Sequence, residues 1–173
     1  YAWALAPAVA TFRAFGLAVA RRDEDLWLAE RKIAGSGAAT IGAAAVVASS
    51  FLLRFPHARF AASVAAPDPG YRAALNDALG AALTDWATHA APPGEHALAS
   101  VFRAALRATL GWEAAPSTVA PGEDGEIDAW REELAAPIEQ GRPRVERGIK
   151  LNAALRLVRD ARTGEARVER MRA

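Results

Sequence analysis

The 21 consecutive residues 33–53, between Lys32 and Arg54, carry no charged side chain. A run of this length could cross a bilayer as a helix. Its composition, however, is mostly Ala, Gly, Ser and Thr, with the large apolar residues concentrated towards its end. No aromatic belt or one-sided basic cluster flanks it, so a transmembrane anchor is only a remote alternative. We expect instead a turn followed by a strand buried on both faces, residues 46–55, which ends before Pro56.

Apolar side chains at helical spacing predict four helices, and short apolar or alternating runs between them predict strands. The predicted helices are residues 5–15, 69–86, 98–110 and 127–138. The predicted strands are residues 17–20, 25–28, 32–33 and 46–55, followed by a C-terminal hairpin of 149–158 and 166–171. Residues 113–125 indicate a linker or long loop, and residues 141–148 a basic loop. The alternation of strands and helices predicts an α+β domain, a sheet with helices packed on it.

Several helix ends carry recognisable signals. Asp68 followed by Pro69 is typical of a capped helix start with proline in the first turn. Gly16 and Gly111 stand where the first and third predicted helices should stop, since glycine readily adopts the left-handed conformation that closes a helix.

Length and composition exclude several classes of function. A chain of 173 residues can form one domain with its own core. A net charge of +1 argues against nucleic-acid binding through bulk positive charge, and the absence of cysteine excludes disulfides and thiolate chemistry. His57, His89 and His96 are too scattered for a metal motif. Because the chain begins with Tyr1 and its single methionine is Met171, we expect part of a longer protein, without a visible signal peptide.

Lys32 is one of only two lysines among 21 basic residues, the other being Lys150. It directly precedes small residues that include Gly35, Ser36 and Gly37, where backbone N–H groups can approach an anion closely. An ammonium can sit between a carbonyl oxygen and a phosphate oxygen and stabilise negative charge that develops during attack on an acyl phosphate. The pattern therefore suggests a site for an activated carboxylate or a phosphate. The alternative is an ordinary hairpin with an exposed lysine before a tight turn.

Three acidic residues precede this segment, at Asp23, Glu24 and Asp25. On a strand, Asp23 and Asp25 would share one face, and a carboxylate there could help to hold Mg²⁺ bound to a nucleotide. The alternative is a solvated acidic loop, or a salt bridge to Arg21 or Arg22.

Three segments together resemble a known family. They are Asp25-Leu26-Trp27-Leu28, Arg31-Lys32-Ile33-Ala34-Gly35-Ser36 and Ser50-Phe51-Leu52-Leu53. The first two are similar to the Asn-Asp-Leu strand and the Gly-Arg-Lys-Ile/Val-Ser/Ala-Gly-Ser-Ala segment of the lipoate–protein ligases. The third stands where that family has Thr/Ser-Leu-Leu-Leu. The resemblance covers roughly residues 1–110.

The resemblance implies a fold and a division of the chain. The implied fold is the class II synthetase-like biotin/lipoyl ligase fold, a mixed β-sheet with packed helices that is incomplete here at its N-terminus. Residues 1–140 would form the C-terminal part of the catalytic domain. Residues 141–173, the basic loop and final hairpin, would begin an accessory domain. The expected location is cytoplasmic, without a membrane or nucleic-acid partner.

The resemblance also implies a two-step reaction. ATP, with Mg²⁺, and lipoate or a related medium-chain acid would give an acyl-adenylate. The acyl group would then move to a lysine of a small lipoyl carrier domain. Lys32 would contact the acyl carbonyl and phosphate oxygens, and Asp25 would lie near the nucleotide and its Mg²⁺. The implied ligand-binding residues are Asp25, Gly35, Ser36, Gly37, Ser49 and Ser50.

Some family positions differ in this chain. Glu24 replaces an asparagine, Glu30 replaces a glycine, and residues 47–49 replace a segment with histidine. The family's Arg-Arg-x-x-Gly-Gly loop is not found in these 173 residues. Two alternatives therefore stay open. One is a non-catalytic paralogue that binds an acyl or nucleotide ligand or an acceptor protein. The other is a lipoyl or octanoyl transferase that does not use ATP.

Overall fold

The computed structural model describes residues 2–41, 44–118, 120, 122–135, 148–160 and 162–171. Its helices are η1 (Ala2–Leu5), α1 (Ala6–Ala14), α2 (His57–Ser63), α3 (Pro69–Ala82), η2 (Trp86–Thr88), α4 (Glu95–Leu110) and α5 (Glu123–Ala135). Its strands are β1 (Ala20–Arg22), β2 (Asp25–Leu28), β3 (Arg31–Ala34), β4 (Ser36–Ile41), β5 (Ala44–Ser49), β6 (Ile149–Lys150), β7 (Leu155–Arg159) and β8 (Ala166–Arg170). The η helices are short 3₁₀ turns.

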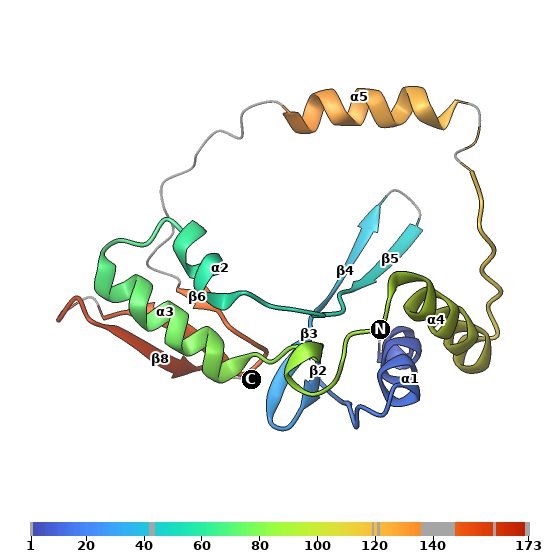
Figure 1. Ribbon diagram of the computed structural model, residues 1–173. Helices are drawn as coiled ribbons and strands as arrows, with labels where there is room; N and C mark the ends of the chain where they lie inside the picture. The colour runs from blue at the N-terminus through green and yellow to red at the C-terminus, as the bar shows by residue number, and fades with distance from the viewer. Residues whose placement is uncertain are drawn as a thin grey trace.

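The strands form three small antiparallel sheets in the orders β1-β2-β3, β4-β5 and β6-β7-β8. Figure 1 shows α1 and α4 side by side at one end, and α3 lying along the C-terminal sheet at the other. The β1-β2-β3 sheet lies between these two parts. This arrangement confirms the predicted α+β class.

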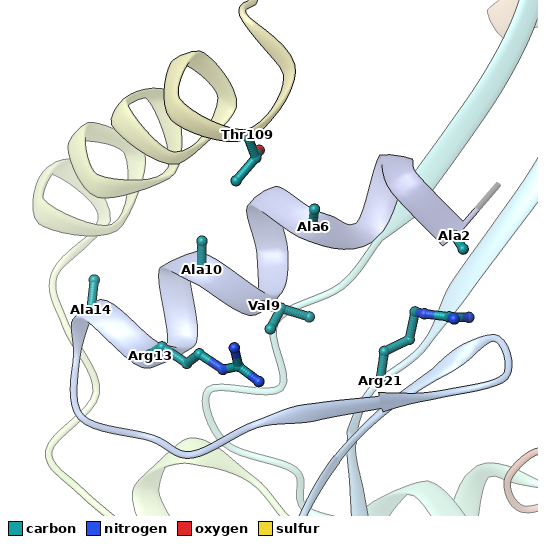
Figure 2. A pocket seen from close by; sticks show the side chains of 8 residues that line it. All are labelled: Ala2, Ala6, Val9, Ala10, Arg13, Ala14, Arg21 and Thr109. Atoms are coloured by element: carbon teal, nitrogen blue, oxygen red, sulfur yellow. The ribbon is translucent and has the colours of Figure 1, made fainter.

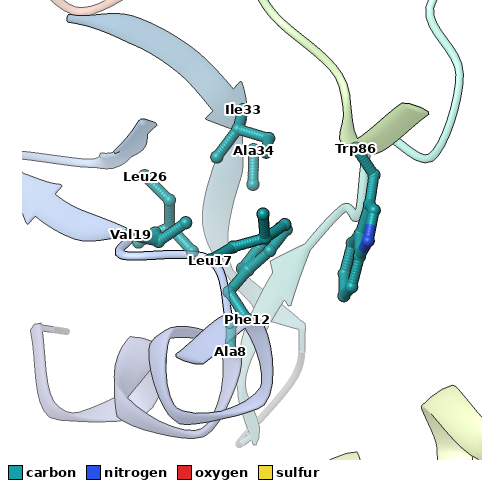
Figure 3. Packing of buried hydrophobic residues seen from close by; sticks show 8 residues of the cluster. All are labelled: Ala8, Phe12, Leu17, Val19, Leu26, Ile33, Ala34 and Trp86. Atoms are coloured by element: carbon teal, nitrogen blue, oxygen red, sulfur yellow. The ribbon is translucent and has the colours of Figure 1, made fainter. Parts of the chain in front are cut away.

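The first hydrophobic core joins α1 to the β1-β2-β3 sheet. Figure 3 shows Phe12 of α1 directed towards Trp86, with Leu26 and Ile33 entering from the strands. All four side chains are fully buried, and the Phe12 and Trp86 rings lie 5.0 Å apart. The first predicted helix is therefore confirmed with Phe12 on its inner face. It ends as predicted at Gly16, which has a φ of 82°.

A second core joins α3 to the C-terminal sheet. Tyr71, Leu75 and Leu79 form the buried face of α3 at i, i+4 spacing and pack against Leu151 and Leu157. The predicted boundary between residues 1–140 and 141–173 stays a prediction. The packing nevertheless shows that β6, β7 and β8 share a core with α3.

The start of α3 is confirmed, but its predicted end at residue 86 is wrong. The Asp68 carboxylate accepts the N–H of Tyr71 at 2.8 Å and caps the helix as expected. The helix stops at Ala82 because Leu83 forms a parallel bridge with Lys32 of β3. Trp86 then begins a separate 3₁₀ turn. Trp86 fits the apolar periodicity of α3, but its side chain is buried in the first core and not in the second core that α3 joins.

The predicted buried strand 46–55 is also wrong. Residues 44–49 form β5, which pairs with β4 in a hairpin whose described side chains are exposed along β5. Val46 remains 41% exposed. Beyond Ser49 the chain is irregular, and Phe51 packs against the first core. In the described part of the chain, no helix has both the length and the apolar character needed to span a bilayer.

The remaining helices differ from the prediction mainly in their limits. α4 packs on α1 and closes at Gly111, where φ is 69°, as predicted. α5 begins at Glu123, so the predicted linker 113–125 overlaps its first turn, and α2 was not predicted. Residues 136–138 of the predicted helix and residues 141–147 of the predicted basic loop lie outside the described residues. The predicted strand 149–158 is interrupted between β6 and β7.

Asp85 attaches the irregular segment before α2 to the first core. Its carboxylate accepts the N–H of Phe55 at 2.7 Å and the N–H and hydroxyl of Thr88 at 2.9 and 2.8 Å. Burial raises the pKa of Asp85, but these donors and the positive charge of Arg54 outweigh burial and leave the pKa below its usual value.

Replacing Asp85 with alanine should lower the free energy of unfolding by about 0.5–2 kcal/mol at neutral pH, because a cap is lost. Since the folded-state pKa is lowered, the stabilisation is complete above the pKa of the unfolded aspartate and is lost as pH falls through the folded pKa. The difference between wild type and Asp85→Ala should therefore shrink in acid, as measured by urea unfolding at several pH values. Asp77→Ala, at an exposed position of α3, is the control. A difference that did not change with pH would contradict this role.

Candidate active site

The pairing of β2 with β3 brings Lys32 and Asp25 together. Trp27 lies opposite Lys32 in the register, and the chain bulges between Leu26 and Trp27. The Lys32 ammonium lies 2.8 Å from Oδ1 of Asp25, and the two side chains are only 18% and 5% exposed. Lys32 is therefore not the exposed hairpin lysine of the alternative interpretation.

Asp25 uses its second carboxylate oxygen as well. Its Oδ2 accepts the N–H of Ala153 at 2.6 Å, from the turn between β6 and β7. Asp23, by contrast, lies in the exposed turn before β2 with a φ of 52°, so it does not share the position of Asp25. Arg22, one of the predicted salt-bridge partners, pairs with Glu30 instead. The carboxylate of Asp25 is thus committed to Lys32 and to one backbone N–H.

These contacts do not fit Asp25 as a direct ligand of Mg²⁺. Magnesium needs octahedral oxygen coordination, usually with one or two carboxylates plus water and phosphate. Both oxygens of Asp25 are engaged by hydrogen-bond donors. Among the residues that the structure describes, no group of three His, Asp or Glu side chains could hold a metal ion. We therefore assign no chemical step to a metal bound at Asp25.

Gly35 lies directly against the end of the Lys32 side chain, and we call this contact the glycine floor of the site. Gly35 joins β3 to β4, and a Cβ added there would lie 3.2 Å from both Cε and Nζ of Lys32. The carbonyl of Gly35 accepts the N–H of Ser50 at 3.0 Å and the hydroxyl of Ser49 at 3.3 Å. The structure thus brings Lys32, Asp25, Gly35, Ser49 and Ser50 together.

The remaining predicted ligand-binding residues lie in the hairpin. Ser36 and Gly37 are the first residues of β4, so the predicted small-residue turn is wrong. The hydroxyl of Ser36 donates to the carbonyl of Glu24 and connects β4 to the turn before β2. Gly37 pairs with Ala48, one position further from Lys32.

The comparisons with known proteins concern the fold. No protein-family model matches the sequence, and no curated protein sequence matches it. Two solved structures do match. One is a bipartite lipoate protein ligase from Thermoplasma acidophilum, studied with its E2 lipoyl domain, at 15% identity and a TM-score of 0.69 over 77% of this chain. The other is lipoate-protein ligase A bound with ATP, at 12% identity and a TM-score of 0.60 over 76% of this chain. The chain has the fold of the lipoate–protein ligases.

The match is partial in length. This chain spans 53% of each of the two solved ligases. The implied fold is therefore confirmed, whereas activity, substrates and partners need separate arguments.

Sequence reasoning missed the contacts that hold the lysine within this lipoate ligase fold. The N–H of Thr84 donates to the carbonyl of Lys32 at 2.8 Å, just beyond the end of α3. The indole Nε1 of Trp27, the cross-strand neighbour of Lys32, is buried without a hydrogen-bond partner among the described residues. Ala153 donates to Asp25 from 128 positions further along the chain. A main-chain donor at that separation has no signal in the sequence.

A separate hollow lies away from this site. Figure 2 shows it along α1, near the end of α4 and beside β1, with a volume of about 730 Å³. Four of its eight lining residues are alanines, and Arg13 and Arg21 also line it. Arg13 donates to the carbonyl of Val19 and Arg21 to that of Asp23, so both side chains also stabilise their own loops. The hollow shares no residue with the Lys32 site.

Proposed function

We propose that this chain supplies the lysine-bearing part of a lipoate–protein ligase. Such an enzyme activates lipoate, or a related medium-chain acid, with ATP and transfers the acyl group to a lysine of a carrier domain. One observation carries the proposal. A lysine ammonium, held by a buried carboxylate, lies against a glycine floor beside two serines in a fold shared with lipoate ligases.

The geometry suits acyl-adenylate chemistry. In the first step a carboxylate oxygen of the acid attacks the α-phosphorus of ATP, and pyrophosphate leaves with the bonding electrons. In the second step the acceptor amine attacks the acyl carbon, loses a proton to solvent, and AMP leaves. An ammonium has three donors, of which Asp25 takes one. The other two can bind the acyl carbonyl and phosphate oxygens as negative charge develops there.

The solved relatives support the choice of substrates. One of them was solved with ATP, and the other was studied with an E2 lipoyl domain. We therefore propose ATP as co-substrate and a lipoyl carrier domain as acceptor. The magnesium that normally accompanies ATP would be held by phosphate oxygens, because the Lys32 ammonium, 2.8 Å from Asp25, would repel a second cation there.

The experiment uses purified protein that contains this chain. Release of pyrophosphate is measured with ATP in the presence and absence of lipoate, and acyl transfer to a lipoyl domain is followed by mass. The proposal requires pyrophosphate release that depends on lipoate. Transfer from an acyl carrier protein with ATP withheld would identify the ATP-independent transferase instead.

A second candidate is a binding protein that no longer catalyses ligation. It is favoured by the ion pairs of Glu24 and Glu30, which stand where the family has asparagine and glycine. Glu24 approaches Lys150 at 3.6 Å, and Glu30 is paired with Arg22. Both carboxylates thus serve surface contacts. Calorimetric binding of lipoate or ATP without pyrophosphate release would establish this candidate and exclude the ligase.

Gly35 and Gly37 offer a matched test of the floor under Lys32. A Cβ at Gly35 would press on the end of the lysine side chain, whereas a Cβ at Gly37 would meet nothing within 4 Å. Because a small misplacement of a catalytic group is costly, Gly35→Ala should lower kcat/KM about tenfold. Gly37→Ala should leave kcat/KM unchanged. Equal effects of the two substitutions on lipoate-dependent pyrophosphate release would show that Gly35 does not support Lys32.

A further inference from the structure

The turn between β6 and β7 is organised by one buried side chain. Asn152 is only 1% exposed, and its Oδ1 accepts the N–H groups of Ala154 and Leu155, both at 2.9 Å. Asparagine commonly forms this kind of local turn with the backbone that follows it. The N–H of Ala153, which precedes these two N–H groups in the chain, donates to a different residue.

That N–H reaches the carboxylate beside Lys32. Ala153 donates to Oδ2 of Asp25 at 2.6 Å, and Oδ1 of the same carboxylate lies 2.8 Å from the Lys32 ammonium. Asn152 therefore shapes the turn that carries the Ala153 N–H, and from that N–H hydrogen-bonded contacts lead through Asp25 to Lys32. The second core holds the turn in place, since Leu151 and Leu157 on either side of it pack against α3.

We propose that Asn152 is a positioning residue for Lys32, acting through the Ala153 N–H and Asp25. The C-terminal sheet thereby sets where the ammonium stands. The catalytic meaning of this positioning rests on the proposed function of Lys32, but the positioning itself does not.

The burial of Asn152 supports a role in orientation. Its Nδ2 is buried without a hydrogen-bond partner among the described residues, which is unfavourable for stability. An apolar side chain of similar size would avoid this unsatisfied donor. Only a polar side chain provides the acceptor that shapes the turn. That acceptor thereby sets the direction of the Ala153 N–H.

The two lysines of the chain allow a direct measurement. The protein is treated with limiting acetic anhydride, and acetylation of Lys32 is compared with that of Lys150 by peptide mass spectrometry. Lys150 has a 53% exposed side chain and serves as the internal reference, whereas Lys32 is 18% exposed and held by Asp25. Asn152→Ala should raise the Lys32-to-Lys150 ratio about fivefold, because the hydrogen bond to the charged carboxylate is weakened.

Three further variants show whether the effect runs through the turn. Asn152→Asp should keep the ratio near that of wild type, since aspartate forms the same turn. Asp25→Asn should raise the ratio at least as much as Asn152→Ala. Asn76→Ala is the matched control, because Asn76 contacts His57 on α2 and not the Lys32 site. It should leave the ratio unchanged.

Either of two labelling results would overturn the proposal. One is an unchanged ratio in Asn152→Ala while Asp25→Asn raises it, which would leave Asp25 independent of the turn. The other is a raised ratio in Asn76→Ala, which would show that general loosening exposes Lys32. If Asn152→Ala does not fold, Asn152→Ser replaces it and should give an intermediate ratio, because serine forms such turns more weakly.

The labelling needs no turnover, so it can fail independently of the proposed ligase activity. Where lipoate-dependent pyrophosphate release is present, Asn152→Ala should lower kcat while the KM for lipoate changes little. A fall in thermal stability without a change in the labelling ratio would indicate a purely structural role and would reject the proposal.

Discussion

Removal of the Lys32 ammonium should lower kcat/KM for lipoate-dependent pyrophosphate release about 10²–10³-fold, as expected for loss of one preorganised charge stabiliser. A simple Lys32→Ala variant would also leave the Asp25 carboxylate buried with one remaining partner, the Ala153 N–H. An unpaired buried charge is strongly destabilising. The cleaner variant therefore combines Lys32→Met with Asp25→Asn, which removes both charges and keeps an acceptor for Ala153.

The matched control for this prediction is the other lysine. Lys150→Met removes an exposed lysine whose only described ion pair, with Glu24, is 3.6 Å long. Its kcat/KM should stay within about twofold of wild type, since exposed ion pairs contribute little. If the double variant at Lys32 and Asp25 retained wild-type turnover in a folded protein, Lys32 would have no part in the chemistry.

Trp86→Ala should lower the free energy of unfolding by about 3–5 kcal/mol, the range for truncating a large buried aromatic residue. Trp86 is fully buried, and its ring contacts Phe12 at 5.0 Å and Phe15 at 5.3 Å. Its backbone N–H, which alanine would keep, donates to the carbonyl of Leu52 at 2.8 Å. The substitution thus opens a cavity between α1, the central sheet and the segment that follows β5. Domains are typically stable by only about 5–15 kcal/mol, so much of the stability would be lost.

Urea unfolding followed by circular dichroism measures this effect as a lower midpoint. Trp130→Ala is the matched control, since Trp130 is 62% exposed on α5 and its loss should change stability by less than about 0.5 kcal/mol. Similar changes in the two tryptophan variants would contradict the central place of Trp86 in the first core.

The hairpin of β4 and β5 shows where apolar pattern misleads. Val46 and Val47 suggested a strand covered on both faces, yet they are 41% and 37% exposed. The Ala, Gly and Ser residues around them offer little area to bury, so β5 stays exposed along its described length. An uncharged segment is compatible with burial, but it does not specify the surface that would cover it.

The candidate site was predictable in part. Lys32, Asp25 and Gly35 were all identified, and the structure brings them together with Ser49 and Ser50. The place of Asp25 near a nucleotide stays a prediction, and the structure adds that its oxygens bind an ammonium and an N–H. A carboxylate in a sequence shows its charge but not the donors that will surround it.

Local sequence alone determined the capped start of α3 at Asp68, the closure of α4 at Gly111 and the position of Lys32 on a strand next to Gly35. These features depend on residues within a few positions, and their physics is that of caps, left-handed glycines and strand pairing. The tertiary structure decided how the ammonium of Lys32 is held. Asn152 and Ala153 reach Asp25 only because the second core packs the C-terminal sheet against α3, and a main-chain N–H is the same at every position until the fold gives it a direction.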